Sequence, residues 1–245
     1  MKIYVINLDR DSHRWSAISA ALAKHENVSL ERVSGVYGPN LPVVAIEILG
    51  GHIQATRHRG TMGAFISHVK AWEAVAESAE PYGVVLEDDA VLIGFDRILS
   101  LSRPDDADLI FLNDRMSPGS RYSPRDAPIH CADIAESLRT LNKSGFGVGG
   151  DGYLLTKRGA GRLLQAVSKD LLFGHVDWRL LRYCLKATDL EGEMKDTRVA
   201  QIVLHHHNPK LPPSWSVIKA YCLSTPIVAF ATGGDSTRMA GDEPA

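Results

Sequence analysis

The stretch Val84-Val85-Leu86-Glu87-Asp88-Asp89 places three consecutive carboxylates directly after a short apolar run. The apolar run predicts a buried strand, and acidic residues are depleted from strands because adjacent carboxylates repel one another. A divalent cation offsets this repulsion, and Mg²⁺ and Mn²⁺ prefer oxygen ligands and leave coordination positions for phosphate groups. The pattern therefore predicts a strand that ends at a metal site, with a solvated acidic turn as the alternative.

The sequence on both sides of this strand alternates between strand and helix patterns, which is typical of an α/β fold. A β-branched strand at residues 2–6, a helix capped at Asp11 or Ser12, and a strand at residues 30–33 predict parallel pairing through a right-handed crossover. Further helices are expected at residues 63–78, 95–101 and 159–167 and from Val176, and further strands at residues 109–112, 153–156 and 200–204. Such folds bind ligands at the carboxyl ends of their strands.

The 245 residues are expected to form one domain over residues 1–234, followed by a polar, fraying tail at residues 235–245. Residues 113–128 contain three prolines and three arginines and are expected to form a surface loop rather than a domain boundary. These arginines are candidates for contact with an anionic acceptor, and plain solvation is the alternative.

Charge and hydropathy narrow the class of protein. The 27 basic and 29 acidic side chains nearly balance, and no lysine-rich run is present, so nucleic acid is not an expected partner. The N-terminal apolar run is too short for a signal peptide, and no stretch reaches the ~20 apolar residues that span a bilayer. Three widely spaced cysteines fit a reducing compartment, so we expect a cytoplasmic protein.

Five motifs follow one another in the first 180 residues. They are Ile6-Asn7-Leu8-Asp9-Arg10 with Arg14, the segment from Gly63 through Ser67 and His68 to Trp72, Leu86-Glu87-Asp88-Asp89, Gly152-Tyr153-Leu154-Leu155 with Gly159-Ala160, and Asp177-Trp178. In this order they resemble glycosyltransferase family 25, the lipooligosaccharide-type galactosyltransferases and their collagen-modifying relatives. The resemblance implies a GT-A-like nucleotide-diphospho-sugar transferase fold, a single α/β domain with a mostly parallel central sheet.

The resemblance also implies a role for the acidic triplet. In nucleotide-sugar transferases the corresponding Asp-x-Asp motif binds the donor, and its last carboxylate ligates the metal that bridges the diphosphate. Asp89 is therefore the expected ligand of Mn²⁺ or Mg²⁺, and Asp88 contributes to donor binding. Glu87 is longer than the usual first aspartate and is expected to support the donor through a hydrogen bond or a water.

Polar residues near the other motifs are further candidates for donor binding. Asn7, Arg10 and Arg14 follow the first strand, and arginine makes bidentate contacts to phosphate, although solvation is the alternative for Arg14. Ser67 and His68 either line the donor pocket or cap and pack their helix. Trp72 lies at helical spacing from other apolar residues, so it is expected in the core.

Two later positions are candidates for metal binding and catalysis. Residues 205–207 are three histidines that follow the predicted strand at 200–204, and imidazole suits Mn²⁺ better than Mg²⁺. His207 is the expected second ligand, and an exposed histidine cluster is the alternative. Asp177 precedes Trp178 at a predicted helix start, where it could be an N-cap. The resemblance makes it the candidate general base that deprotonates the acceptor hydroxyl.

The resemblance thus implies a metal-dependent, inverting glycosyltransferase. It would move a hexose, in first place galactose, from a UDP-sugar to a hydroxyl of a glycan or lipid-linked oligosaccharide acceptor, such as lipooligosaccharide or lipopolysaccharide, with peripheral contact to the inner membrane. A metal-dependent phosphoesterase and a noncatalytic sugar-binding relative are the alternatives. Residues 145–150 match the G-x-G-x-x-G of a dinucleotide-binding turn, but the required strand before it and helix after it are absent from the sequence pattern.

Overall fold

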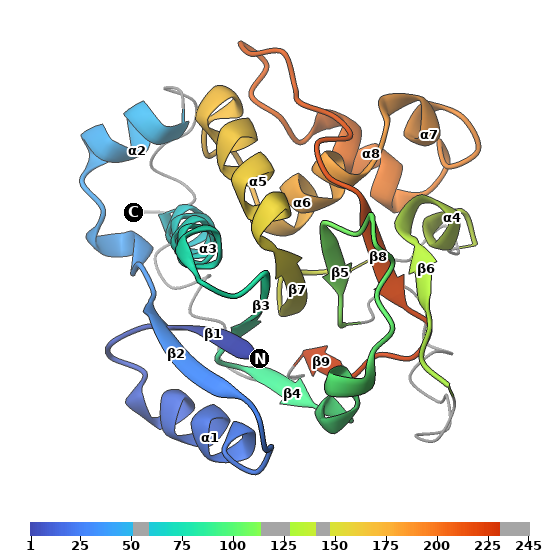
Figure 1. Ribbon diagram of the computed structural model, residues 1–245. Coiled ribbons are helices and arrows are strands. Elements are labelled where there is room, and N and C mark those ends of the chain that lie inside the picture. Colours follow the sequence, from blue (N-terminus) through green and yellow to red (C-terminus); the bar gives the residue numbers. More distant parts are fainter. Residues whose placement is uncertain (51–58, 114–127, 141–147, 231–245) are drawn as a thin grey trace.

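The computed structural model describes residues 1–50, 59–113, 128–140 and 148–230, and these residues form a seven-stranded sheet with helices on both faces (Figure 1). The strand order is β2-β1-β3-β7-β5-β8-β6. The bounds are β1 (Lys2–Asn7), β2 (Ser29–Ser34), β3 (Tyr82–Glu87), β5 (Leu109–Phe111), β6 (Cys131–Asp133), β7 (Gly152–Thr156) and β8 (Ala220–Leu223). A separate pair, β4 (Ala90–Leu92) and β9 (Val228–Phe230), is antiparallel.

The central sheet is mostly parallel, as predicted. β1 pairs in parallel with both β2 and β3, and β5 pairs in parallel with β8. β7 is antiparallel to its neighbours β3 and β5, and β6 is antiparallel to β8. Five strands therefore point one way and two point the other, so the carboxyl ends of β1, β2 and β3 lie along one edge. The α/β class is confirmed, and this arrangement agrees with the expected GT-A-like fold.

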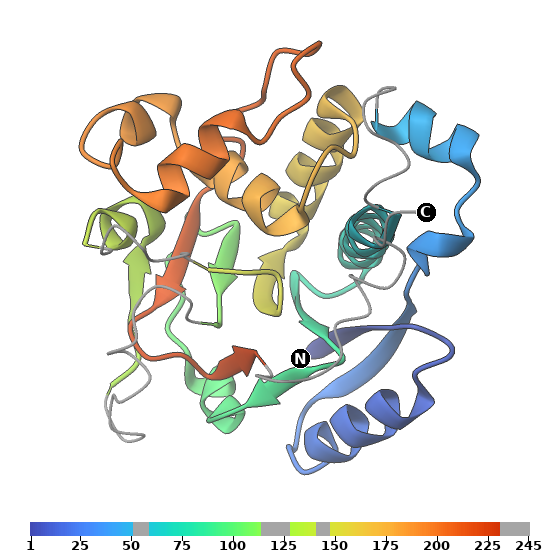
Figure 2. The same cartoon turned by 180° about the vertical axis from the view of Figure 1, so that it is seen from behind.

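The helices divide between the two faces of the sheet (Figures 1 and 2). α1 (Ser12–Leu22) lies on one face, and α3 (Arg59–Glu77), α5 (Lys157–Asp170), α6 (Val176–Cys184) and α8 (Arg198–His205) lie on the other. The shorter elements are α2 (Val43–Gly50), α4 (Ile134–Arg139), α7 (Ala187–Glu191) and the 3₁₀ turns η1 (Gly38–Asn40) and η2 (Phe95–Ser100).

Strand periodicity builds one apolar core on each face. Because successive side chains of a strand point to opposite faces, Ile3 and Val5 of β1 pack with α1, whereas Tyr4 packs with α3. β3 repeats the pattern, with Val85 on the α3 side and its two apolar neighbours on the α1 side. Trp72 of α3 is fully buried, so its predicted place in the core is confirmed.

One predicted strand is wrong. Residues 200–204 lie in α8, where the side chain of Thr197 accepts a hydrogen bond from the backbone N–H of Ala200 and caps the helix. Val199, Ala200 and Val203 are buried at helical spacing, so packing against α6 overrides the β-branched composition. The other predicted helices and strands are present with shifted ends, and residues 95–101 form a 3₁₀ turn.

Three expectations fall on residues outside the described ranges. The arginine-rich loop, the first half of the glycine run at 145–150 and the tail at 235–245 belong to this group. None of the helices in the described residues combines the length and the apolar character that crossing a bilayer requires.

Candidate active site

A pocket opens at the carboxyl ends of β1 and β3, where the α/β pattern predicts a ligand site. It contains about 610 Å³ of space, part of which is open to solvent. Its wall is formed by Ile6, Leu8, Arg14, Gly35, Val36, Tyr37, Gly38, Gly60, Ala64, Ser67, His68, Glu87, Asp88 and Asp89. The pocket therefore combines segments after β1, β2 and β3 with one side of α3.

Of the three acids of the triplet, only the first belongs to the strand. β3 ends at Glu87, and Asp88 and Asp89 form the turn that leads into β4, so strand alternation does not extend to them. All three line the pocket. Burial raises the pKa of Asp88 above its ordinary range, although the hydrogen bond from Asn7 and the charge of Arg14 act in the opposite direction.

Asn7 and Arg14 both contact the second acid of the triplet. The Asn7 side-chain amide donates a 2.6 Å hydrogen bond to Asp88 Oδ2, and a guanidinium nitrogen of Arg14 lies 3.5 Å from Asp88 Oδ1. Asn7 Oδ1 accepts in turn from Arg32, at 2.8 Å. The opening motif and the acidic motif thus meet in one hydrogen-bonded group, and Arg14 lines the pocket rather than lying in solvent.

Arg10 occupies a different place from Arg14. Its guanidinium stacks over the Tyr37 ring at 4.0 Å from the centroid, and Tyr37 is one of the pocket-lining residues. Arg10 itself is exposed and is not part of the lining. Arg10 therefore lies at the rim of the pocket, and its contact with the donor stays a prediction.

Ser67 and His68 of α3 both line the pocket, and their predicted contact with a donor stays a prediction. Ser67 Oγ accepts from the backbone N–H of Val36 at 2.8 Å and donates to the Gly63 carbonyl at 2.7 Å. A Cβ on Gly63 would lie 2.4 Å from the Val36 carbonyl oxygen, so glycine permits this close approach of helix and loop. His68 Nε2 lies 3.1 Å from Glu87 Oε1.

Asp177 lies in the first turn of α6 and close to the pocket. The N-cap position belongs to His175, so the N-cap interpretation of Asp177 is wrong. The backbone N–H of Gly150 donates to Asp177 Oδ1 at 2.7 Å. A Cβ on Gly150 would lie 2.9 Å from Asp177 Oδ1 and 3.2 Å from His68 Nε2, so both side chains approach the same point. The predicted base therefore lies near His68, which is one of the residues that line the pocket.

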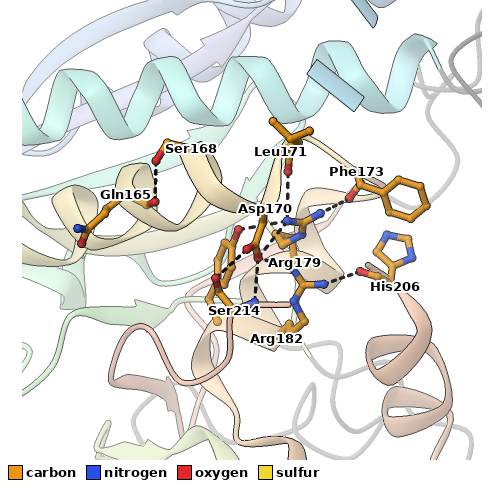
Figure 3. Close-up of polar contacts among 10 residues, drawn as sticks. Gln165, Ser168, Asp170, Leu171, Phe173, Arg179, Arg182, His206 and Ser214 are labelled. Atoms are coloured by element: carbon orange, nitrogen blue, oxygen red, sulfur yellow. Dashed lines mark hydrogen bonds and ion pairs between the residues drawn. The ribbon is translucent and has the colours of Figure 1, made fainter. Parts of the chain in front are cut away.

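A buried charged cluster fixes the segment that leads into α6 (Figure 3). Asp170 accepts from Arg182 at 2.7 Å, from Arg179 at 3.4 Å and from the hydroxyl of Ser214 at 2.7 Å. Arg179 also donates to the carbonyl oxygens of residues 171 and 173, which lie on the way to α6. Both guanidiniums are almost completely buried, and their Nε atoms have no hydrogen-bond partner within the described residues.

His205 is the exposed last residue of α8, and the carbonyl of the next residue, His206, accepts a hydrogen bond from Arg182 of this cluster. His206 Nε2 accepts from the backbone N–H of His175 at 2.6 Å, which requires a neutral, unprotonated nitrogen. Burial, followed by the charges of His175 and Arg179, lowers the pKa of His206 to about 3. His207 Nδ1 lies 3.1 Å from the Leu204 carbonyl, and burial lowers its pKa as well. Neither ring is part of the pocket lining, so metal binding by His207 stays a prediction.

The chemistry of the pocket fits a hard divalent cation. Its candidate ligands are carboxylate oxygens, which Mg²⁺ and Mn²⁺ prefer, and Asp89 is one of them. Among the described residues, no three His, Cys, Asp or Glu side chains gather closely enough to hold a metal ion by themselves. A cation bound here would therefore need further ligands from water or from a phosphate group.

Several residues that shape the site were not predicted from the sequence. Tyr153 contacts His68, and Gly150 donates a hydrogen bond to Asp177. Arg32 donates a hydrogen bond to Asn7, and Tyr37 lines the pocket. Asn113 fixes the residue before Gly150, because its side chain accepts a hydrogen bond from the Gly149 N–H and donates one to the Gly149 carbonyl. Tyr153 belongs to one of the five motifs, and this was the sequence feature that could have marked it as a site residue. For Gly150 the only such feature was the glycine-rich run in which it lies.

Carboxylates and an arginine around a pocket at the ends of parallel strands are features of an α/β glycosyltransferase. A family model described as Glycosyltransferase family 25 (LPS biosynthesis protein) matches residues 1–177. The chain therefore belongs to glycosyltransferase family 25, as its five motifs predicted. Procollagen galactosyltransferases 1-B and 1-A of Xenopus laevis are 29% and 28% identical to it in an alignment of 181 positions, and each match covers 67% of this chain. The matched part is 28% of each relative's length.

Two solved structures show a remote likeness. The apo-form glycosyltransferase GlyE of Streptococcus pneumoniae TIGR4 has a TM-score of 0.40 and 8% identity, over 96% of this chain and 55% of that chain. Galactosyltransferase LgtC in complex with donor and acceptor sugar analogs has a TM-score of 0.38 and 10% identity, over 83% of this chain and 70% of that chain. Likenesses of this size carry no argument about activity.

Proposed function

We propose that this protein is a metal-dependent, inverting galactosyltransferase that uses UDP-galactose and transfers galactose to a hydroxyl of a glycan acceptor. Family membership makes it a glycosyltransferase; metal, donor, acceptor and stereochemistry are what the proposal adds. The observation that carries the proposal is the pocket at the end of β3, which is lined by Arg14 and by the acids Glu87–Asp89. Asp177 and the pocket residue His68 both lie close to Gly150.

The donor is proposed to bind with its diphosphate beside Asp89 and Arg14. Arginine forms bidentate hydrogen bonds to phosphate oxygens, and Arg14 is partly buried, which strengthens such contacts. Mn²⁺ or Mg²⁺ bound at Asp89 would neutralise the negative charge that develops on the leaving diphosphate. Asn7 donates a hydrogen bond to Asp88 and accepts one from Arg32, so these contacts hold the opening motif against the acidic triplet.

Asp177 is proposed to take the proton from the acceptor hydroxyl. A general base must lie within hydrogen-bond reach of the proton that it accepts, and the Gly150 amide fixes the position of one carboxylate oxygen. The segment ahead of α6 is held by Arg179, so the base sits on a rigid support. Inversion would follow from direct attack of the activated hydroxyl on the anomeric carbon.

The acceptor class and location belong to the same proposal. The names of the relatives and of the family point to two acceptor classes, collagen and lipopolysaccharide, and we favour a lipopolysaccharide-type glycan. An acceptor of this class would bring the protein to the cytoplasmic surface of the inner membrane.

The two alternatives make different demands on the site. A two-metal phosphoesterase needs several protein ligands at fixed positions, and the described residues hold no group of three such side chains. A noncatalytic sugar-binding relative would not need three acids and a positioned base. UDP release that requires donor, Mn²⁺ and acceptor together separates the transferase from both.

The decisive experiment compares wild-type protein with Asp89→Ala in this assay. We expect the substitution to abolish turnover and Mn²⁺-dependent UDP binding while the circular dichroism spectrum stays native. Asp105→Ala, at an exposed position outside the pocket, is the matched control and should keep full activity. Normal turnover by Asp89→Ala would overturn the metal assignment, and UDP release without acceptor at the same rate would overturn the transferase.

A further inference from the structure

Three of the five motifs meet in one buried hydrogen-bond chain. Trp72 Nε1 lies 2.8 Å from the Tyr153 hydroxyl, this hydroxyl lies 2.9 Å from His68 Nδ1, and His68 Nε2 lies 3.1 Å from Glu87 Oε1. Trp72 and Tyr153 are fully buried and His68 is 1% exposed, whereas Glu87 lines the donor pocket. The chain therefore runs from the core beneath α3 to the pocket wall.

The chemistry of the groups fixes the direction of this chain. The indole N–H of Trp72 can only donate, so the Tyr153 oxygen accepts from it. Burial raises the pKa of Tyr153, so the hydroxyl keeps its own proton. That proton points to His68 Nδ1, the other contact of the hydroxyl. If Nδ1 carried a proton, the phenolic proton would be buried without an acceptor, which is unfavourable.

We propose that Tyr153 fixes His68 as the neutral tautomer with its proton on Nε2, and that the two residues position the Glu87 carboxylate to accept a hydrogen bond from a hydroxyl of the nucleotide-sugar. An ionised carboxylate accepts hydrogen bonds and cannot donate them, so Glu87 suits a hydroxyl group rather than a phosphate. The identity of this ligand rests on the proposed function. The tautomer rests on the buried chain alone.

The inference also accounts for glutamate at the first position of the triplet. Glu87 is the last residue of β3, and its carboxylate must span the gap to His68 on α3. An aspartate side chain is one methylene shorter, so its carboxylate would lose contact with Nε2. We therefore expect Glu87→Asp to weaken donor binding although the charge is unchanged.

Nitrogen NMR of the histidine rings tests the tautomer without any substrate. At neutral pH we expect His68 to show a protonated Nε2 and an unprotonated Nδ1, and Tyr153→Phe to lose this pattern. Tyr4→Phe removes an equally buried hydroxyl that donates to the Ala74 carbonyl, so it controls for loss of a core hydroxyl. A wild-type His68 with its proton on Nδ1, or on both nitrogens, would overturn the inference.

Kinetics test the positioning role in the same variants. We expect Tyr153→Phe and His68→Leu to lower kcat/KM for UDP-galactose about 10- to 100-fold, mainly through KM, and Tyr4→Phe to leave it unchanged. His68→Gln keeps an N–H near the position of Nε2 and should recover part of the loss. Equal kcat/KM for His68→Leu and wild type would contradict the positioning role. If the wild type neither binds nor uses UDP-galactose, the proposed donor is wrong, and the NMR result still decides the tautomer.

Discussion

At the residue scale, the Gly150 amide holds Asp177 whether or not the side chain is charged. Asp177→Asn keeps an oxygen that can accept this hydrogen bond, so the position of the side chain should be preserved while its basicity is lost. We expect unchanged UDP-galactose affinity in calorimetry and a transfer rate lowered at least about 100-fold. A rate near that of the wild type would assign the base to another residue.

Gly150 offers a second residue-scale prediction. A Cβ at this position would lie 2.9 Å from Asp177 Oδ1 and 3.1 Å from His68 Cε1, which is too close for both to keep their places. Gly150→Ala should therefore lower kcat strongly while the protein remains folded. Gly161→Ala in α5 is the control, because a Cβ there meets nothing within 4 Å and alanine favours a helix by up to about 1 kcal/mol. Equal kcat for the two variants would contradict the crowding argument.

The acidic triplet, Arg14 and His68 were predictable as pocket residues because a motif or a strand end marks each of them. The partners of these residues were not. Arg32 holds Asn7 and Tyr153 holds His68, and both contacts join positions at least 25 residues apart. Such pairings depend on the relative placement of elements, which periodicity within a single element does not contain.

At the element scale, the segment between α5 and α6 depends on one buried carboxylate. Asp170→Asn keeps the shape but leaves Arg179 and Arg182 without their negative partner in the core. We expect a loss of about 3–5 kcal/mol in the free energy of unfolding, measured by urea denaturation. Glu31→Gln breaks the exposed pair with Lys2 and should cost less than about 1 kcal/mol. Similar losses in the two variants would mean that the cluster is not electrostatically coupled.

The elements themselves were predictable to different degrees. β1, α3 and β3 have strong periodicity and appear where expected, whereas α8 was taken for a strand because its valines and isoleucine favour β structure. The capping residue Thr197 was the sequence signal for a helix start. β6, β8 and β9 are short, and the pairing partners that stabilise them lie far away in the sequence.

At the scale of the whole molecule, the parallel pairing of the first two strands followed from the sequence, and the order of the other strands did not. A strand-helix-strand opening has one favoured handedness, so β1 and β2 could be paired in advance. β7 enters the sheet antiparallel between β3 and β5, and this insertion places Tyr153 beneath His68. No local pattern specifies such an insertion, so the hydrogen-bond chain to the pocket became visible only in the folded molecule.

The pH dependence of global stability follows from the neutral state of His206. Its pKa is about 3 in the folded protein against an ordinary value of 6.5, so between these values the unfolded chain binds a proton that the folded chain does not. The free energy of unfolding should therefore fall as the pH drops below 6.5, by at most about 1.4 kcal/mol per pH unit from this group. His206→Gln can still accept from the His175 N–H but does not titrate, so its stability should depend less on pH over the same range. Urea denaturation of both proteins between pH 4 and pH 8 measures the difference, and parallel curves would show that His206 has the same pKa in the folded and the unfolded chain.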